Sequence, residues 1–82
     1  MRLSLLYFAA VRELLGRGEE TLDVAGERAT VAELLVELVR RHPQLAGSLD
    51  QVRVAVNETF VDAEAVLRDG DAVALIPPVA GG

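Results

Sequence analysis

The sequence contains no cysteine, no lysine and no tryptophan, and its one histidine is His42. Without cysteine, the chain has no disulfide scaffold, no thiolate metal site and no cysteine nucleophile, and this favours a cytoplasmic protein. No apolar stretch approaches the roughly 20 residues of a membrane-spanning helix, so we expect no membrane association. The apolar start of the chain is interrupted by Arg12 and Glu13, and we interpret it as a strand, not a signal peptide.

Positive charge is scarce as well. Eight basic residues, all arginine, stand against 13 acidic residues, and the formal net charge is −5. Nucleic-acid binding requires concentrated lysine or arginine to contact phosphates, so we expect no nucleic-acid partner. The acidic balance instead suits solubility and attraction to a basic partner surface.

The 82 residues, 51% of them hydrophobic, are sufficient for one small globular domain. We place this domain at residues 1–77, followed by a flexible C-terminal tail at residues 78–82. Free ends with small residues are commonly disordered, so the tail taken alone is weak evidence for a function.

The first residues indicate a strand with two apolar faces. Leu3, Leu5 and Tyr7 alternate with Ser4, Leu6 and Phe8. One face must lie in the core, and the other is either covered or is a contact surface. A short helix at 9–15, ending near a glycine, and a charged edge strand at 20–24 are predicted next.

The clearest local signal is an amphipathic helix that begins after Thr30. Thr30 and Glu33 have the spacing of a capping box, and apolar residues then recur on one helical face. Pro43 prevents the helix from continuing, and His42 precedes it at the helix end. Residues 45–49 are predicted to form a turn or a short helical connection.

Three strands are predicted in the second half, at 52–56, 59–61 and 72–76. Asn57 and Glu58 form the turn between the first two, and Gly70 supplies a turn before the last. The simplest arrangement is an α+β fold, a mixed four- to five-stranded sheet packed on one main helix. This order and length fit the β-grasp, or ubiquitin-like, fold.

The side chains do not combine into an enzyme active site. His42 is best explained as part of a helix end, and Asp69 and Asp71 flank a turn glycine without the further carboxylates of a calcium loop. We expect no metal site and no cofactor bound by this chain. Whether the chain is formally an enzyme stays open at this point, with the catalytic residues expected on a partner.

The C-terminal segment is the leading candidate for chemistry. Pro77 and Pro78 stiffen its base, and Gly81 and Gly82 lack Cβ atoms that would hinder passage through a narrow channel. Extended, the segment from Pro77 reaches about 17 Å, enough to enter a partner's active site. Adenylation of the Gly82 carboxylate by ATP would allow sulfur to displace AMP and leave a thiocarboxylate.

The chain resembles the small subunits of molybdopterin synthase, a family of ubiquitin-like sulfur carriers. The matching segments are residues 7–16 (YFAAVRELLG), 54–59 (VAVNET), 67–74 (LRDGDAVA) and 77–82 (PPVAGG). The resemblance therefore covers essentially the whole chain. It implies that Gly82 is adenylated by an E1-like activating enzyme, which uses ATP, and is thiocarboxylated with sulfur from a donor protein. The sulfur then goes to cyclic pyranopterin monophosphate in the active site of the large subunit, within a heterotetramer.

The resemblance also implies an exposed apolar docking patch. It would comprise Phe8, Phe60 and Ile76, and Ile76 replaces an aromatic residue that is common at this position in the family. The tail residues Pro77, Pro78, Val79 and Ala80 would contact the partner, and Arg12 would either support the interface or be solvated. Two alternatives stay open: a sulfur carrier for thiamine, cysteine or tRNA thiolation, and a ubiquitin-like protein modifier.

Overall fold

The computed structural model describes residues 1–78. Its elements follow one another as β1 (Arg2–Tyr7), α1 (Ala9–Leu15), β2 (Glu19–Asp23), β3 (Arg28–Thr30), α2 (Val31–Arg41), the 3₁₀ helix η1 (Pro43–Leu45), β4 (Arg53–Val56), β5 (Thr59–Val61), β6 (Val66–Arg68) and β7 (Ala72–Ile76).

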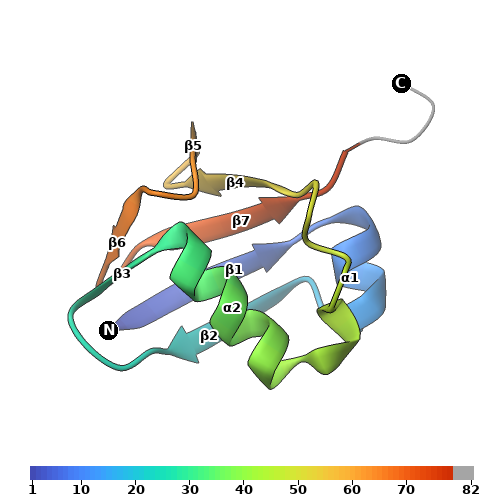
Figure 1. Cartoon of the computed structure of the whole chain (residues 1–82), viewed down its shortest axis with the longest axis horizontal. Coiled ribbons are helices and arrows are strands. Elements are labelled where there is room, and N and C mark those ends of the chain that lie inside the picture. The colour runs from blue at the N-terminus through green and yellow to red at the C-terminus, as the bar shows by residue number, and fades with distance from the viewer. Residues whose placement is uncertain (79–82) are drawn as a thin grey trace.

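Five strands form one sheet in the order β2-β1-β7-β4-β5. The central strands β1 and β7 are parallel, and their other neighbours in the sheet are antiparallel. The helix α2 lies across one face of this sheet (Figure 1). The predicted α+β class, the mixed sheet of four to five strands and the single main helix are confirmed, and the arrangement is that of a β-grasp fold.

The core lies between α2 and the sheet face that it covers, which we call the inner face. Buried side chains from alternate positions of the strands meet the apolar stripe of the helix. They form one cluster that contains Leu3, Leu5, Tyr7, Val11, Leu22, Val31, Leu34, Leu38, Leu45, Val54, Leu67, Val73 and Leu75.

The ends of α2 form as the sequence predicts. The Thr30 hydroxyl accepts a hydrogen bond from the Glu33 amide, and the Glu33 carboxylate accepts one from the Thr30 amide, which completes the capping box. The helix ends at Arg41, and the His42 amide donates to the Leu38 carbonyl. Neither α-helix among residues 1–78 has the length and apolar character needed to cross a bilayer.

Two features differ from the prediction. A small second sheet pairs β3 with β6, two strands of three residues each that are too short to give an alternating pattern. In addition, β1 ends at Tyr7, and Phe8 is the N-cap residue of α1 instead of a strand residue. Phe8 therefore lies at the corner where the chain leaves the sheet.

Candidate functional site

The sheet face opposite α2 carries a row of apolar side chains across four strands. The strand register pairs Leu6 with Ala74, Ala74 with Ala55, and Ala55 with Phe60. Since side chains alternate between faces, these four residues share the face that α2 leaves uncovered. Together with Phe8 and Ile76, we call them the outer apolar face.

The two phenylalanines are the most exposed large members of this face. Phe8 is 45% exposed and Phe60 is 51% exposed, whereas Leu6 and Ile76 are partly buried. Ala55 is buried although it lies outside the core cluster, and Ala74 is partly buried. Because alanine side chains are short, the surface over Ala55 and Ala74 is lower than the aromatic rings beside it, and another protein can contact it there.

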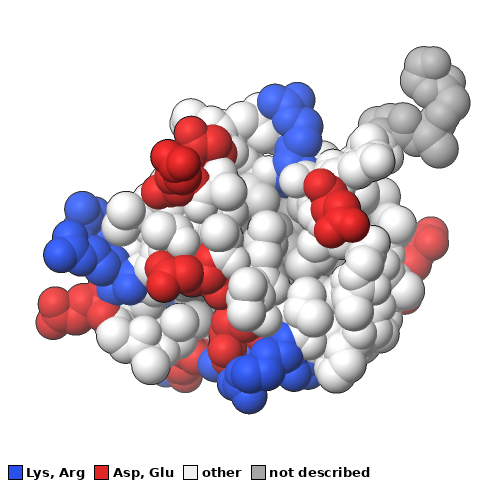
Figure 2. Space-filling model, in the orientation of Figure 1, with Lys and Arg blue, Asp and Glu red and all other residues white. Residues whose placement is uncertain are grey.

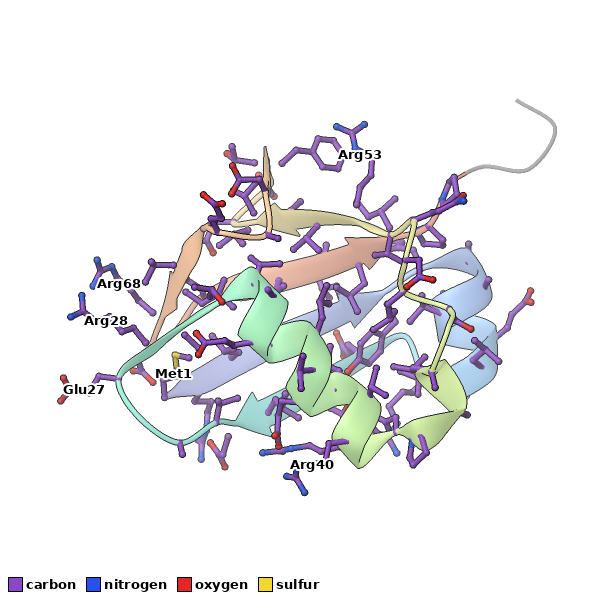
Figure 3. The ribbon with its side chains drawn as sticks, viewed as in Figure 1. Met1, Glu27, Arg28, Arg40, Arg53 and Arg68 are labelled. Atoms are coloured by element: carbon purple, nitrogen blue, oxygen red, sulfur yellow. The ribbon has the colours of Figure 1, made fainter. Side chains whose placement is uncertain are left out.

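Arg53 places a positive charge at the edge of the outer apolar face. It pairs with Ile76 across β4 and β7, and its guanidinium lies 4.0 Å from the centroid of the Phe60 ring. This cation–π contact holds the Phe60 side chain without burying it (Figure 3). The ring is therefore both exposed and restrained.

The structure brings together only part of the site expected from the sequence. Phe60 and Ile76 lie on strands of the sheet, and Ile76 is less exposed than the Phe60 ring, whereas Phe8 lies at the corner beyond the end of β1. That the three form one docking patch stays a prediction. Arg12 contacts a different region: its guanidinium packs against Gly18 in the loop before β2. Its part in a partner interface stays a prediction.

The base of the C-terminal segment lies beside a shallow surface pocket. Pro77 is partly buried and Pro78 is exposed, and together with Ala10 and the loop around Ser48 they line a pocket of about 360 Å³. The expected contact residues Val79 and Ala80, and the reactive pair Gly81 and Gly82, lie outside the described residues.

His42 belongs to a polar cluster on the inner side of the sheet. The Tyr7 hydroxyl donates a 2.6 Å hydrogen bond to Glu20 Oε2, and His42 Nε2 lies 3.0 Å from the same oxygen. Burial and this hydrogen bond raise the pKa of Tyr7. The cluster joins β1, β2 and the end of α2. Its polar groups satisfy one another's hydrogen-bonding capacity, so it does not resemble an open catalytic site.

Sequence reasoning missed Leu6, Arg53 and the two alanines of the outer apolar face. The alternation in β1 already places Leu6 on the face of Phe8, so this residue was accessible from its pattern. The other three depend on strand order: Ala74 and Ala55 meet only because β7 lies next to β4.

Comparisons with known proteins agree with the fold and the resemblance. Residues 5–82 match the ThiS family. The molybdopterin synthase sulfur carrier subunit of Chlamydomonas reinhardtii is 40% identical over 85 residues, which cover 100% of both chains. The human protein of the same name is 38% identical, with 99% of this chain and 94% of that protein covered.

Solved structures give the same picture. SAMP1 of Haloferax volcanii, a small archaeal modifier protein, superposes with a TM-score of 0.87 at 31% identity, and 100% of both chains is covered. A structure of subunits 1 and 2 of the Helicobacter pylori molybdopterin-converting factor in complex matches in fold, with a TM-score of 0.69 at 23% identity and 100% of both chains covered. The chain therefore belongs to the ThiS family and is a relative, along its whole length, of the sulfur carrier subunits of molybdopterin synthase.

Proposed function

We propose that this chain is the sulfur carrier subunit of a molybdopterin synthase. The Gly82 carboxylate attacks the α-phosphate of ATP and releases pyrophosphate, and sulfur then displaces AMP to leave a thiocarboxylate. Two loaded chains each deliver one sulfur to cyclic pyranopterin monophosphate to form the dithiolene of molybdopterin, and water restores the Gly82 carboxylate as each sulfur leaves. The observation that carries the proposal is the match, over the full length of the chain, to relatives named as such carriers.

The partner in this proposal is the large subunit of the synthase, in a heterotetramer. Subunit 1 of the H. pylori molybdopterin-converting factor, which has the same fold, was solved in complex with subunit 2. The outer apolar face is the surface that we assign to this contact, because exposed aromatic anchors dominate the energy of many protein interfaces. Phe8 and Phe60 are these anchors, and Pro77 and Pro78 lead from the docked domain towards the active site.

Activation requires two further proteins, an E1-like adenylating enzyme and a sulfur donor. We assign ATP to the adenylating enzyme and no cofactor to this chain. The outer apolar face presents aliphatic and aromatic groups, so general acids and bases for the transfer must come from the large subunit. In this scheme, residues 78–82 act as a flexible tail on the domain formed by residues 1–77.

Intact mass spectrometry tests the proposal directly. After incubation with the activating enzyme, ATP and a sulfur source, replacement of one terminal oxygen by sulfur adds about 16 Da. The product should then convert the pterin precursor when the large subunit is added. Failure to gain the mass would reject carrier activity, and a loaded chain that does not convert the precursor would indicate another thiolation pathway.

Protein modification is a second candidate, because SAMP1, a modifier by name, is so similar in structure. A modifier forms an amide bond between its C-terminal carboxyl and an amine of the target, with loss of AMP from the adenylate. Tryptic peptides in which a lysine of another protein carries residues 69–82, the segment that follows the last arginine of the chain, would support this activity. If no such peptides are found while sulfur transfer is intact, the carrier function is the only one supported.

A further inference from the structure

The small sheet formed by β3 and β6 carries two arginines directly opposite one another. Arg28 pairs with Arg68 in the antiparallel register, and both side chains are exposed. The sheet lies at the end of the molecule away from the end of β7, and both arginines extend outward from it (Figures 1 and 3). Figure 2 shows basic side chains at this end of the visible surface, with acidic side chains beside them.

Like charges at directly opposite positions of a β-ladder repel each other. Within residues 1–78, neither Arg28 nor Arg68 forms a salt bridge, whereas Arg2, Arg17, Arg40 and Arg41 each pair with a carboxylate and Arg53 lies over a ring. This arrangement is notable in a chain whose acidic residues outnumber its arginines.

Three of the carboxylates near the pair are engaged elsewhere. Asp69 Oδ1 accepts from the Arg2 amide, and the Asp71 carboxylate accepts from Asn57 and from the backbone amide of Arg68. Glu33 is held in the capping box, and the exposed Glu27 on the preceding loop forms no salt bridge with either arginine. The two guanidinium groups are therefore available for an external anion.

An apolar residue completes this surface. Val66 lies two residues before Arg68 on the same side of β6 and is 47% exposed, opposite Thr30 of β3. Arg28, Thr30, Glu33 and Val66 line a shallow pocket of about 240 Å³. Leu67, which points to the other side, is buried and anchors the ribbon in the core.

We propose that the outer side of the β3–β6 ribbon is a docking surface for an acidic segment of a partner protein. Two carboxylates of the segment bind Arg28 and Arg68, and an apolar side chain beside them packs on Val66. Arginine matches carboxylates with paired hydrogen bonds. A protein segment is favoured over a nucleic acid for two reasons. The net charge of −5 repels a long polyanion, and a nucleic acid has no apolar side chain to pack on Val66. The proposal does not depend on sulfur transfer.

A titration followed by NMR tests this surface. The probe is a capped hexapeptide of alternating glutamate and leucine, added to the ¹⁵N-labelled full chain at low salt. We expect shifts at the amides of residues 28–30 and 66–68, and at least a fivefold loss of affinity at about 0.5 M salt, where charges are screened within a few ångström. The peptide with glutamine in place of glutamate should bind at least fivefold more weakly.

The variant with Arg28→Gln and Arg68→Gln should lose at least fivefold in affinity. Its matched control, Arg2→Gln with Arg40→Gln, removes the same charge from arginines that already have partners, and should bind as the wild type does. Equal affinity of both variants, or shifts at other arginines, would overturn the proposal. Equal or tighter binding of inorganic phosphate at the same amides would reassign the surface to phosphate. Self-association that the Arg28/Arg68 variant abolishes would reassign it to a second copy of the chain.

Discussion

The hydroxyl of Tyr7 donates a hydrogen bond of 2.6 Å to the carboxylate of Glu20, across the neighbouring strands β1 and β2. The same carboxylate oxygen lies 3.0 Å from His42 Nε2 at the end of α2, and Arg17 binds the other oxygen. One carboxylate therefore links two strands, a helix end and the loop before β2. This makes Glu20 the polar centre of a molecule whose buried core is otherwise apolar.

Tyr7→Phe should lower the free energy of unfolding by about 1–2 kcal/mol, because it removes a hydrogen bond to a charged, partly buried acceptor. The ring itself stays in the core, so the fold is kept. Urea unfolding measures the loss. In a Glu20→Gln background the same substitution should cost less, and an equal cost in both backgrounds would show that the two side chains are not coupled.

Glu20 should make the protein sensitive to acid. Burial alone would raise the pKa of this carboxyl, but hydrogen bonds from Tyr7 and His42 and the charges of His42 and Arg17 outweigh burial and lower the pKa below its ordinary value of 4.5. Since the pKa is lower in the folded state, this stabilisation is present above the unfolded value and is lost as the pH falls through the folded value.

The measurement is urea unfolding between about pH 6 and pH 3, across the window where an ordinary carboxyl titrates. Glu20→Gln should lose less stability over this range than the wild type. Part of the acid dependence will remain in the variant, because hydrogen bonds from Arg40 and Arg41 lower the pKa of Glu37 to about 2. Parallel curves for wild type and variant would contradict the role of Glu20.

Glu58→Gly should stabilise the protein by about 0.5–1 kcal/mol, because both residues of the β4–β5 turn have positive φ, +49° at Asn57 and +71° at Glu58. Glycine adopts this conformation without steric cost. Asn57→Gly is the matched control. It relieves the same strain but loses hydrogen bonds to Asp71 and to the Ala72 amide, so its melting temperature should fall. A lower melting temperature for Glu58→Gly would refute the argument.

Phe60→Glu should weaken binding to the large subunit at least tenfold, because it replaces one of the two aromatic anchors of the docking surface with a charge. Its matched control is Val36→Glu, which changes another exposed apolar residue, 71% exposed, on α2. Isothermal titration calorimetry measures both affinities. Similar losses of affinity for the two variants, or no loss for Phe60→Glu, would show that the outer apolar face is not part of the interface.

Deletion of Gly81 and Gly82 should leave the melting temperature unchanged within about 2 °C, because the residues of the buried core lie between Leu3 and Leu75. The same deletion should abolish loading with sulfur. Calorimetry and intact mass give the two readouts. A large loss of stability would mean that the terminal glycines contribute to folding rather than to chemistry.

Local signals were sufficient for most of the fold. The capping box and the apolar stripe of α2 act within a few residues, and the apolar runs of β1 and β7 identify these strands without tertiary information. The pair β3 and β6 could not be predicted, because three residues do not define a period; β5 is equally short, but the turn at Asn57 and Glu58 marks it. Their stability comes from Leu67, which only the assembled core buries.

The candidate site depends more strongly on tertiary structure. Phe8, Phe60 and Ile76 were predicted together through a family resemblance. Of the residues between them, Leu6 follows from the alternation in β1, and the two alanines follow from strand order alone. The contact of Arg53 with Phe60, and the meeting of Glu20 with His42, join residues from separate elements. No local pattern encodes such contacts, because the first depends on the pairing of β4 with β5 and the second on the packing of α2 against the sheet.

The central position of β7 has a consequence for biosynthesis. This strand is the last of the described elements to leave the ribosome, yet β1 and β4 both need it as a neighbour. A nascent chain that stops before residue 72 has no strand to join β1 to β4, so the five-stranded sheet cannot form until β7 has been synthesised. Truncated chains that lack β7 therefore do not form the complete sheet, and an activating enzyme that requires this sheet would not bind them.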